Sequence, residues 1–150
     1  MKEAIKLSFK GMKTNQGGPF GAIIVKNGKI VGRGVNRVTS TNDPTAHAEI
    51  VAIRDACKKL KSFRLDNCII YTSSEPCPMC FGAIHWARIK KVFFACTRLD
   101  AANIEFDDDY IYQEIVKSID QRNVDTEQLM RDEAIEAFKL WRKKRDKIKY

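Results

Sequence analysis

The chain has 150 residues, of which 44% are apolar and 31% charged, as expected for one soluble domain with a sizeable hydrophobic core. No apolar run reaches the ~20 residues that a membrane-spanning helix needs. Charged residues interrupt the first ten residues, MKEAIKLSFK, so we expect neither a membrane segment nor a secretory signal, and a cytoplasmic location.

The formal net charge of +8 is concentrated at the C-terminus. The last twelve residues, KLWRKKRDKIKY, carry a net charge of +6, and the other 138 residues carry only +2. Basic side chains near the end of a helix are favoured by its dipole. We therefore interpret this segment as the solvated end of a terminal helix in preference to a nucleic-acid contact, although phosphates remain an alternative partner.

The first third of the chain predicts a helix followed by a β-hairpin. Apolar residues recur on one face of residues 2–13, which favours a short helix. GGPFG at 17–21 is a turn sequence. The apolar segments FGAIIV and IVGRGV then flank KNGK, in which Asn27-Gly28 is a strong hairpin signal. The polar segment VTSTND, 38–43, is expected to be a loop.

A second helix is predicted after Asp43-Pro44, which supplies a capping side chain and a first-turn proline. Apolar residues follow at helical spacing and predict one buried stripe. These residues are Ala46, Ile50, Ile53, Cys57 and Leu60.

The remaining segments alternate between strands and helices. We expect strands at 68–73 and 92–96, a helix at 78–89 between them, and further helices at 110–119 and 127–145. Strands separated by helices favour parallel pairing, and the N-terminal hairpin makes the sheet mixed. The sequence therefore predicts an α/β fold.

The chain contains five cysteines, an odd number that argues against a disulfide framework in the absence of an export signal. They are Cys57, Cys68, Cys77, Cys80 and Cys96. Cys77 and Cys80 form a C-x-x-C pair in SEPCPMC, at a predicted strand-to-helix junction, and such a pair is the usual half of a zinc site. We interpret the other three as small core residues.

A redox dithiol and a structural zinc site are the alternatives for this pair. Redox chemistry would leave TAHAEI, residues 45–50, unexplained. A structural zinc needs a fourth protein ligand, and no candidate has a persuasive spacing. Those candidates are His85, Cys57, Cys68 and Cys96.

His47 is the natural third ligand, because three protein ligands leave one position for water, as in a catalytic zinc site. Glu49 follows two residues later at the start of a helix, where both side chains can reach the metal region. The order H-x-E…P-C-x-x-C is the signature of zinc-dependent nucleobase deaminases. We therefore predict a catalytic Zn²⁺ held by His47, Cys77 and Cys80.

The chemistry needs Glu49 close to the metal but not bound to it. Zinc lowers the pKa of bound water from ~15.7 toward ~7, so hydroxide forms at neutral pH. Attack on an amidine-like carbon then needs a proton at the ring nitrogen and another at the departing amine. A single carboxylate can carry both protons.

Four stretches resemble the cytidine deaminase-like superfamily over residues 2–110, and bacterial guanine deaminases in particular. They are GGPFGAIIVKNG, NDPTAHAE, YTSSEPCPMCFGAIHWARI and DAANIEFDDDYIY. The last of these and the terminal Tyr150 point to guanine deaminases, whereas the others are shared by several branches. The resemblance implies a three-layer α/β/α sandwich with a mixed five-stranded sheet in a single deaminase domain, 1–150. It also implies a homodimer in which residues 127–150 pack on the partner, and hydrolysis of guanine to xanthine and ammonia.

Substrate contacts follow from this resemblance. Asp108 is expected to accept hydrogen bonds from the ring N–H groups of guanine. The Asn36 amide can donate to and accept from a base edge, and Phe20 can stack on a purine. Further candidates are Trp86, Tyr150, Glu75 and the backbone near Ala48. Turn, core or solvated roles remain the alternatives for Asn36, for the aromatic residues and for the acidic run.

Other functions remain open from the sequence. A tRNA-specific adenosine deaminase shares the metal motifs and could use the basic tail, but the acidic FDDD run would repel an RNA backbone. Cytosine or cytidine deamination ranks after it. A non-enzymatic alternative is a binding module in which zinc only holds the fold together.

Overall fold

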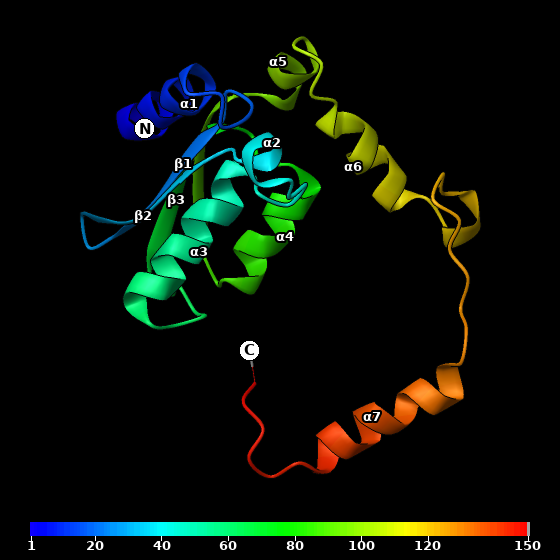
Figure 1. The fold of residues 1–150 in the computed structure, drawn as a ribbon. Helices are drawn as coiled ribbons and strands as arrows, with labels where there is room; N and C mark the ends of the chain where they lie inside the picture. Colours follow the sequence, from blue (N-terminus) through cyan, green and yellow to red (C-terminus); the bar gives the residue numbers. More distant parts are fainter. Residues whose placement is uncertain (150) are drawn as a thin grey trace. The chain divides into compact units, whose positions relative to one another are not determined.

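The computed structural model describes residues 1–149 and divides the chain into two compact units, 1–112 and 113–150 (Figure 1). Within the described residues no helix has the length and apolar character needed to cross a membrane. The strands are β1 (Gly21–Lys26), β2 (Lys29–Val35), β3 (Cys68–Ser74) and β4 (Lys91–Cys96). The helices are α1 (Lys2–Lys13), α2 (Val38–Thr41), α3 (Ala48–Leu60), α4 (Pro78–Trp86), α5 (Arg98–Ala102), α6 (Asp108–Val116), η1 (Ile119–Gln121) and α7 (Arg131–Lys143).

The sheet of the first unit is mixed, as predicted. Its order is β2-β1-β3-β4, with β1 antiparallel to β2 and β3, and β3 parallel to β4. The hairpin turn lies at Asn27 and Gly28, which both have positive φ. Residues 1–149 form four strands in this sheet, so the expected fifth strand is wrong. After β4, a capping box between Thr97 and Asp100 starts α5 instead.

Two glycines allow α3 to lie directly on β2. A Cβ atom at Gly34 would be 2.0 Å from the Ala48 carbonyl oxygen, and one at Gly32 would be 2.4 Å from that of Ala52. A side chain at either position would therefore push the helix away. The N-terminal end of α3, which carries His47, is fixed against the sheet by this close backbone contact.

The buried stripe of α3 differs in part from the prediction. Ala46 and Ile50 are buried as expected, but three predicted members are only partly buried. These are Ile53, Cys57 and Leu60. The fully buried positions that face the sheet are Ala48, Ala52 and Ala56. Small residues occupy this face because the helix and the glycine-bearing strand approach so closely.

The predicted start of α3 is wrong by several residues. The Asp43 carboxylate accepts hydrogen bonds from the backbone N–H and the hydroxyl of Thr45, at 2.8 and 2.6 Å, and forms a turn. The helix begins at Ala48, and His47 is its N-cap. The expected polar loop at 38–43 contains the one-turn helix α2, because the Arg37 carbonyl accepts a hydrogen bond from the Thr41 N–H.

Helix α1 lies on the face of the sheet opposite α3 and α4 (Figure 1). It matches the predicted helix at 2–13. Gly21 of β1 faces α1, where a Cβ atom would lie 2.3 Å from the Ala4 carbonyl oxygen. The first unit therefore carries helices on both faces of its sheet.

The second unit contains η1 and α7. The predicted helices at 110–119 and 127–145 are present as α6 and α7, with shifted ends. In α7 the large apolar side chains Phe138, Leu140 and Trp141 are all exposed.

Candidate active site

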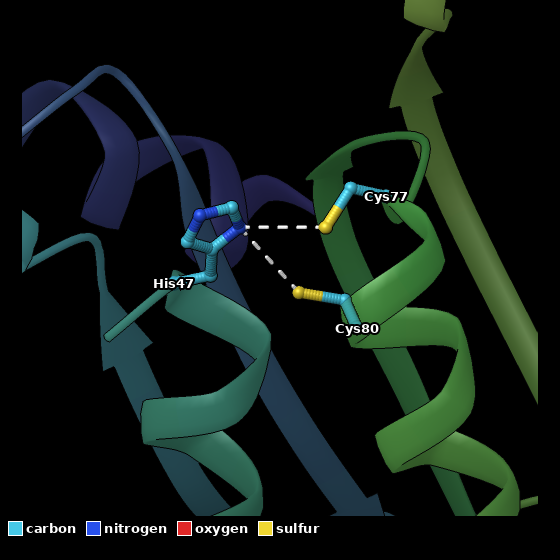
Figure 2. Close-up of side chains that lie close together, drawn as sticks. All are labelled: His47, Cys77 and Cys80. Carbon is cyan, nitrogen blue, oxygen red and sulfur yellow. Dashed lines mark hydrogen bonds between the residues drawn. The ribbon is translucent and has the colours of Figure 1, made fainter. Parts of the chain in front are cut away.

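Two helix N-termini bring the three predicted metal ligands together. His47 is the N-cap of α3, and Cys77 is the N-cap of α4, with Cys80 one turn later. The His47 Nδ1 atom lies 3.5 Å from Cys77 Sγ and 3.7 Å from Cys80 Sγ (Figure 2). The three ligand atoms all lie within 4.8 Å of one another. Among residues 1–149, no other histidine, cysteine or acidic residue joins this cluster.

The cluster has the dimensions of a zinc site. Zinc in a tetrahedral site has Zn–S bonds of ~2.3 Å and Zn–N bonds of ~2.0–2.1 Å, which separate a sulfur from a nitrogen ligand by about 3.5 Å. The two observed Nδ1–Sγ distances agree with this value. One imidazole and two sulfur atoms form a donor set that zinc prefers. The residues present therefore fit the ion.

The electrostatics of the cysteine pair favour a thiolate. The pKa of Cys77 is lowered to about 4, because Cys80 and then His47 hydrogen bond to its charged sulfur. The pKa of Cys80 is raised, because Cys80 donates to Cys77 and because it is buried. The contact with the Cys77 sulfur raises the pKa of His47.

We call the three side chains of His47, Cys77 and Cys80 the metal cluster, and the Glu49 side chain is buried beside it. Its Oε1 atom accepts a hydrogen bond of 3.0 Å from the Thr72 hydroxyl, and its Oε2 atom is 3.5 Å from Cys80 Sγ. Burial raises the pKa of the Glu49 carboxyl group. A raised pKa suits a carboxyl group that must both accept and release protons near neutral pH.

A pocket of about 230 Å³ opens onto this cluster and is smaller than the ~300–1,000 Å³ of typical drug-sized sites. His47, Glu49 and Cys77 line it on the metal side. The predicted substrate contacts that also line it are Phe20, Asn36, Glu75 and Asp108. The structure thus gathers seven of the predicted site residues around one cavity, whereas their individual roles stay predictions.

The three adjacent aspartates have three different environments. Asp107 accepts a hydrogen bond of 3.1 Å from the Tyr110 backbone N–H at the start of α6. Asp109 forms an ion pair with Arg98 at 3.2 Å. Asp108, between them, lines the pocket, and burial raises the pKa of its carboxyl group. The acidic run is therefore not simply a solvated surface.

The segment that carries Asp108 is attached to the loop before Cys77 at two points. The Glu75 carboxylate accepts a hydrogen bond of 3.0 Å from the Arg98 backbone N–H. The Tyr112 hydroxyl donates a hydrogen bond of 2.9 Å to the Pro76 carbonyl. We call residues 97–112 the recognition segment. Its contacts hold Asp108 at a fixed place beside the metal cluster.

Two predicted contacts, Ala48 and Trp86, do not line this pocket, and a third falls outside the described residues. Ala48 is fully buried at the start of α3. Trp86 is 64% exposed at the end of α4. Tyr150 lies outside the described residues. Glu75, by contrast, lines the pocket.

Several residues at the site were not predicted from the sequence. Thr72 and Ser74 lie on the same face of β3, which strand periodicity could have indicated. The Ser74 hydroxyl is buried and has no hydrogen-bond partner within the described residues. Phe106 lines the pocket and contacts Phe20 edge-to-face, with ring centroids 4.8 Å apart. The other missed lining residues are Gly18, Val38, Thr39 and Pro44.

Three relatives match the sequence of this chain over different lengths. Guanine deaminase from Bacillus subtilis is 51% identical over all 150 residues of this chain, and the match covers 96% of that protein's own length. The tRNA-specific adenosine deaminase from Buchnera aphidicola (subsp. Schizaphis graminum) is 45% identical over 67% of this chain and 66% of its own length. The tRNA-specific adenosine deaminase from Aquifex aeolicus is 48% identical over 51% of each chain.

Two solved structures of guanine deaminases also superpose on this chain. The crystal structure of the Bacillus subtilis guanine deaminase superposes with a TM-score of 0.96, at 51% identity, and covers 99% of this chain and 95% of that one. A guanine deaminase structure from Nitrosomonas europaea gives a TM-score of 0.67, at 32% identity, with 71% of this chain and 62% of that chain covered. The family model described as the cytidine and deoxycytidylate deaminase zinc-binding region matches residues 1–96. Together with the clustered His47, Cys77 and Cys80, these findings show that the chain belongs to the zinc-binding cytidine and deoxycytidylate deaminase family.

Proposed function

We propose that this protein is a zinc-dependent guanine deaminase, which hydrolyses guanine to xanthine and ammonia. The observation that carries the proposal is the position of Asp108. This residue belongs to the acidic run that points to guanine deaminases, and it lines the same pocket as Glu49 and Cys77. The 51% identity to a guanine deaminase over the whole chain supports the same substrate.

His47, Cys77 and Cys80 are the proposed zinc ligands. Zinc bound there supplies a Lewis acid that lowers the pKa of a water molecule in the pocket. His47, Cys77 and Cys80 would hold the metal beside Glu49, whose Oε2 atom lies 3.5 Å from Cys80 Sγ. Glu49 lines the same pocket as His47 and Cys77, so its carboxyl group is placed to exchange protons with a water there.

Glu49 carries the protons of the reaction. A water oxygen adds to the guanine carbon that bears the amino group, and Glu49 takes the proton that this water releases. Glu49 then protonates the adjacent ring nitrogen. The proton of the newly added hydroxyl group passes through Glu49 to the amino group, the carbon–nitrogen bond breaks as the carbonyl forms, and the amine leaves as ammonia. One carboxyl group serves every transfer, as expected for general acid–base catalysis in a closed site.

Three side chains are proposed to orient the base. Asp108 accepts hydrogen bonds from ring N–H groups, and Asn36 offers both a donor and an acceptor from a buried position. Asn36 is held because its Oδ1 atom accepts a hydrogen bond of 3.2 Å from the Val38 backbone N–H. Phe20 is fixed by its edge-to-face contact with Phe106, which leaves an aromatic wall for the purine ring.

The charge of the pocket favours a free base over tRNA. The cavity of about 230 Å³ suits a single base, whether free or flipped out of a strand. Carboxylates at Glu75 and Asp108 line it, and they would repel the phosphates on both sides of a flipped-out nucleotide. The tRNA-specific adenosine deaminases compared above also match only 51–67% of this chain.

We further propose a cytoplasmic homodimer in which the partner completes the site. The surface of α4 and of the edge strand β4 exposes several large apolar side chains, which is typical of a subunit interface. They are Met79, Phe81, Trp86, Phe93 and Phe94. In this arrangement residues 127–150 pack on the partner, and Trp86 and Tyr150 retain their predicted contacts with substrate. Sedimentation of the full chain as a monomer would contradict the dimer.

The test of the function is a substrate panel. We expect the zinc-loaded protein to release ammonia from guanine, and not from adenine, cytosine, cytidine or a tRNA anticodon stem-loop. Xanthine formation is followed by chromatography in the same samples. Turnover of the stem-loop without turnover of guanine would overturn the proposal in favour of the tRNA-specific alternative.

A further inference from the structure

A buried threonine holds the proton-carrying residue. The Thr72 hydroxyl donates a hydrogen bond of 3.0 Å to Glu49 Oε1, and the exposed fractions of the two residues are 1% and 5%. Glu49 lines the pocket, whereas Thr72 is not among the residues that line it. Thr72 therefore acts on the substrate only through Glu49.

The donor hydroxyl has a fixed position. Thr72 lies on β3, an inner strand, where it pairs with Ala22 of β1 on one side and Phe94 of β4 on the other. A β-branched side chain on a strand has few accessible χ1 rotamers. Glu49, in contrast, has three side-chain torsions, and the last of them is broad and roughly two-fold. The sheet therefore provides a rigid donor for a side chain that has more rotatable bonds than the donor.

This hydrogen bond distinguishes the two carboxyl oxygens. Oε1 is occupied by the Thr72 hydroxyl, and Oε2 faces Cys80 Sγ on the side of the metal cluster. We propose that Thr72 is a positioning residue, which keeps Glu49 oriented with Oε2 toward the metal cluster as the oxygen that exchanges protons. The inference rests on the function proposed above and adds a residue that no ligand motif includes.

Substitutions at Thr72 test the hydroxyl separately from the shape of the side chain. Thr72→Val keeps the branched shape and removes the donor, and Thr72→Ser keeps the donor. We expect kcat for guanine to fall about 10- to 100-fold in Thr72→Val, with KM within about twofold of wild type, because a hydrogen bond to a charged group is lost while the base contacts stay. Thr72→Ser should retain kcat within about threefold.

Ser73→Ala is the matched structural control. Ser73 is the next residue of β3 and its hydroxyl accepts a hydrogen bond of 3.0 Å from the Gly21 backbone N–H, away from Glu49. This variant should lower the melting temperature but leave kcat unchanged. Zinc content, measured by elemental analysis, should equal that of wild type in all three variants. Equal kcat in wild type and a folded, zinc-loaded Thr72→Val would overturn the inference, and so would an equal loss in Thr72→Ser.

A crystal structure of Thr72→Val supplies a readout that does not depend on turnover. We expect the Glu49 carboxyl group to rotate away from the orientation seen beside Cys80. An unchanged carboxyl orientation would overturn the positioning role. If the wild-type protein does not act on guanine, the proposed function fails, but this comparison of the Glu49 side chain still decides the role of Thr72.

Discussion

Replacement of Glu49 by glutamine tests the proposed chemistry with little change in shape. Glutamine has the same length, and its carbonyl oxygen can still accept the hydrogen bond of 3.0 Å that Thr72 donates. Its amide group would lie where Oε2 now contacts Cys80. The fold and the metal ligands should therefore be preserved, because the substitution also removes a buried carboxylate that is costly to desolvate.

The expected loss of rate follows from the loss of proton transfer. Positioned general acid–base catalysis contributes ~10²–10⁴-fold to a rate. Glu49 serves several transfers, so we expect kcat for guanine to fall by about 10³-fold or more in Glu49→Gln, equivalent to ~4 kcal/mol in the activation barrier. KM should change little, because the proposed base contacts are made by other side chains.

The assay combines turnover with metal content. Ammonia release from guanine is measured for wild type and Glu49→Gln after both have been shown to contain equal zinc by elemental analysis and to melt within a few degrees of each other. Wild-type kcat in the zinc-loaded glutamine variant would refute the role assigned to Glu49. It would also favour the alternative in which the metal serves only the fold.

Three further substitutions test recognition, metal binding and packing. Asp108→Asn should raise KM for guanine or lower kcat/KM at least 10-fold, because the amide would present donors to the ring N–H groups. Asp109→Asn is its control. Equal kinetics in the two variants would contradict the role of Asp108. Cys80→Ser should lower the zinc content well below one ion per chain and make the protein unfold at lower temperature. The control variant Cys57→Ser should keep its zinc. Full zinc occupancy in Cys80→Ser would be inconsistent with the proposed ligand set. Gly34→Ala should destabilise the fold by about 1–3 kcal/mol in urea denaturation, because the new methyl group would overlap the backbone of α3. An unchanged urea midpoint would mean that α3 does not lie on β2 as described.

The cluster of His47, Cys77 and Cys80 was predictable from sequence because zinc chemistry restricts the residue types. Few side chains bind zinc, and the spacing of Cys77 and Cys80 together with His47 left few alternatives. The structure places their ligand atoms within 4.8 Å of one another. The hairpin was equally predictable, because Asn27 and Gly28 tolerate the positive φ that a two-residue turn requires.

Other features depend on tertiary contacts that leave little trace in the sequence. Asp43-Pro44 is a sound local signal for a helix start, yet Asp43 forms a turn with Thr45 and the helix begins at Ala48. Thr72 was missed because threonine in a strand is common, and its importance follows only from the neighbouring Glu49 carboxylate. The fifth strand was expected from the resemblance, whereas a capping box after β4 starts a helix.

The division of the site along the chain has an evolutionary consequence. His47, Glu49, Cys77 and Cys80 lie at the N-terminal ends of α3 and α4, whereas Asp108 lies on the recognition segment, which begins after the last strand. The recognition segment contacts the rest of its unit through Glu75, Pro76 and Phe20, so substitutions that keep these contacts should leave the cluster of His47, Cys77 and Cys80 in place. Lineages that inherit the same hydrolytic apparatus could therefore acquire a new substrate by remodelling this short stretch alone.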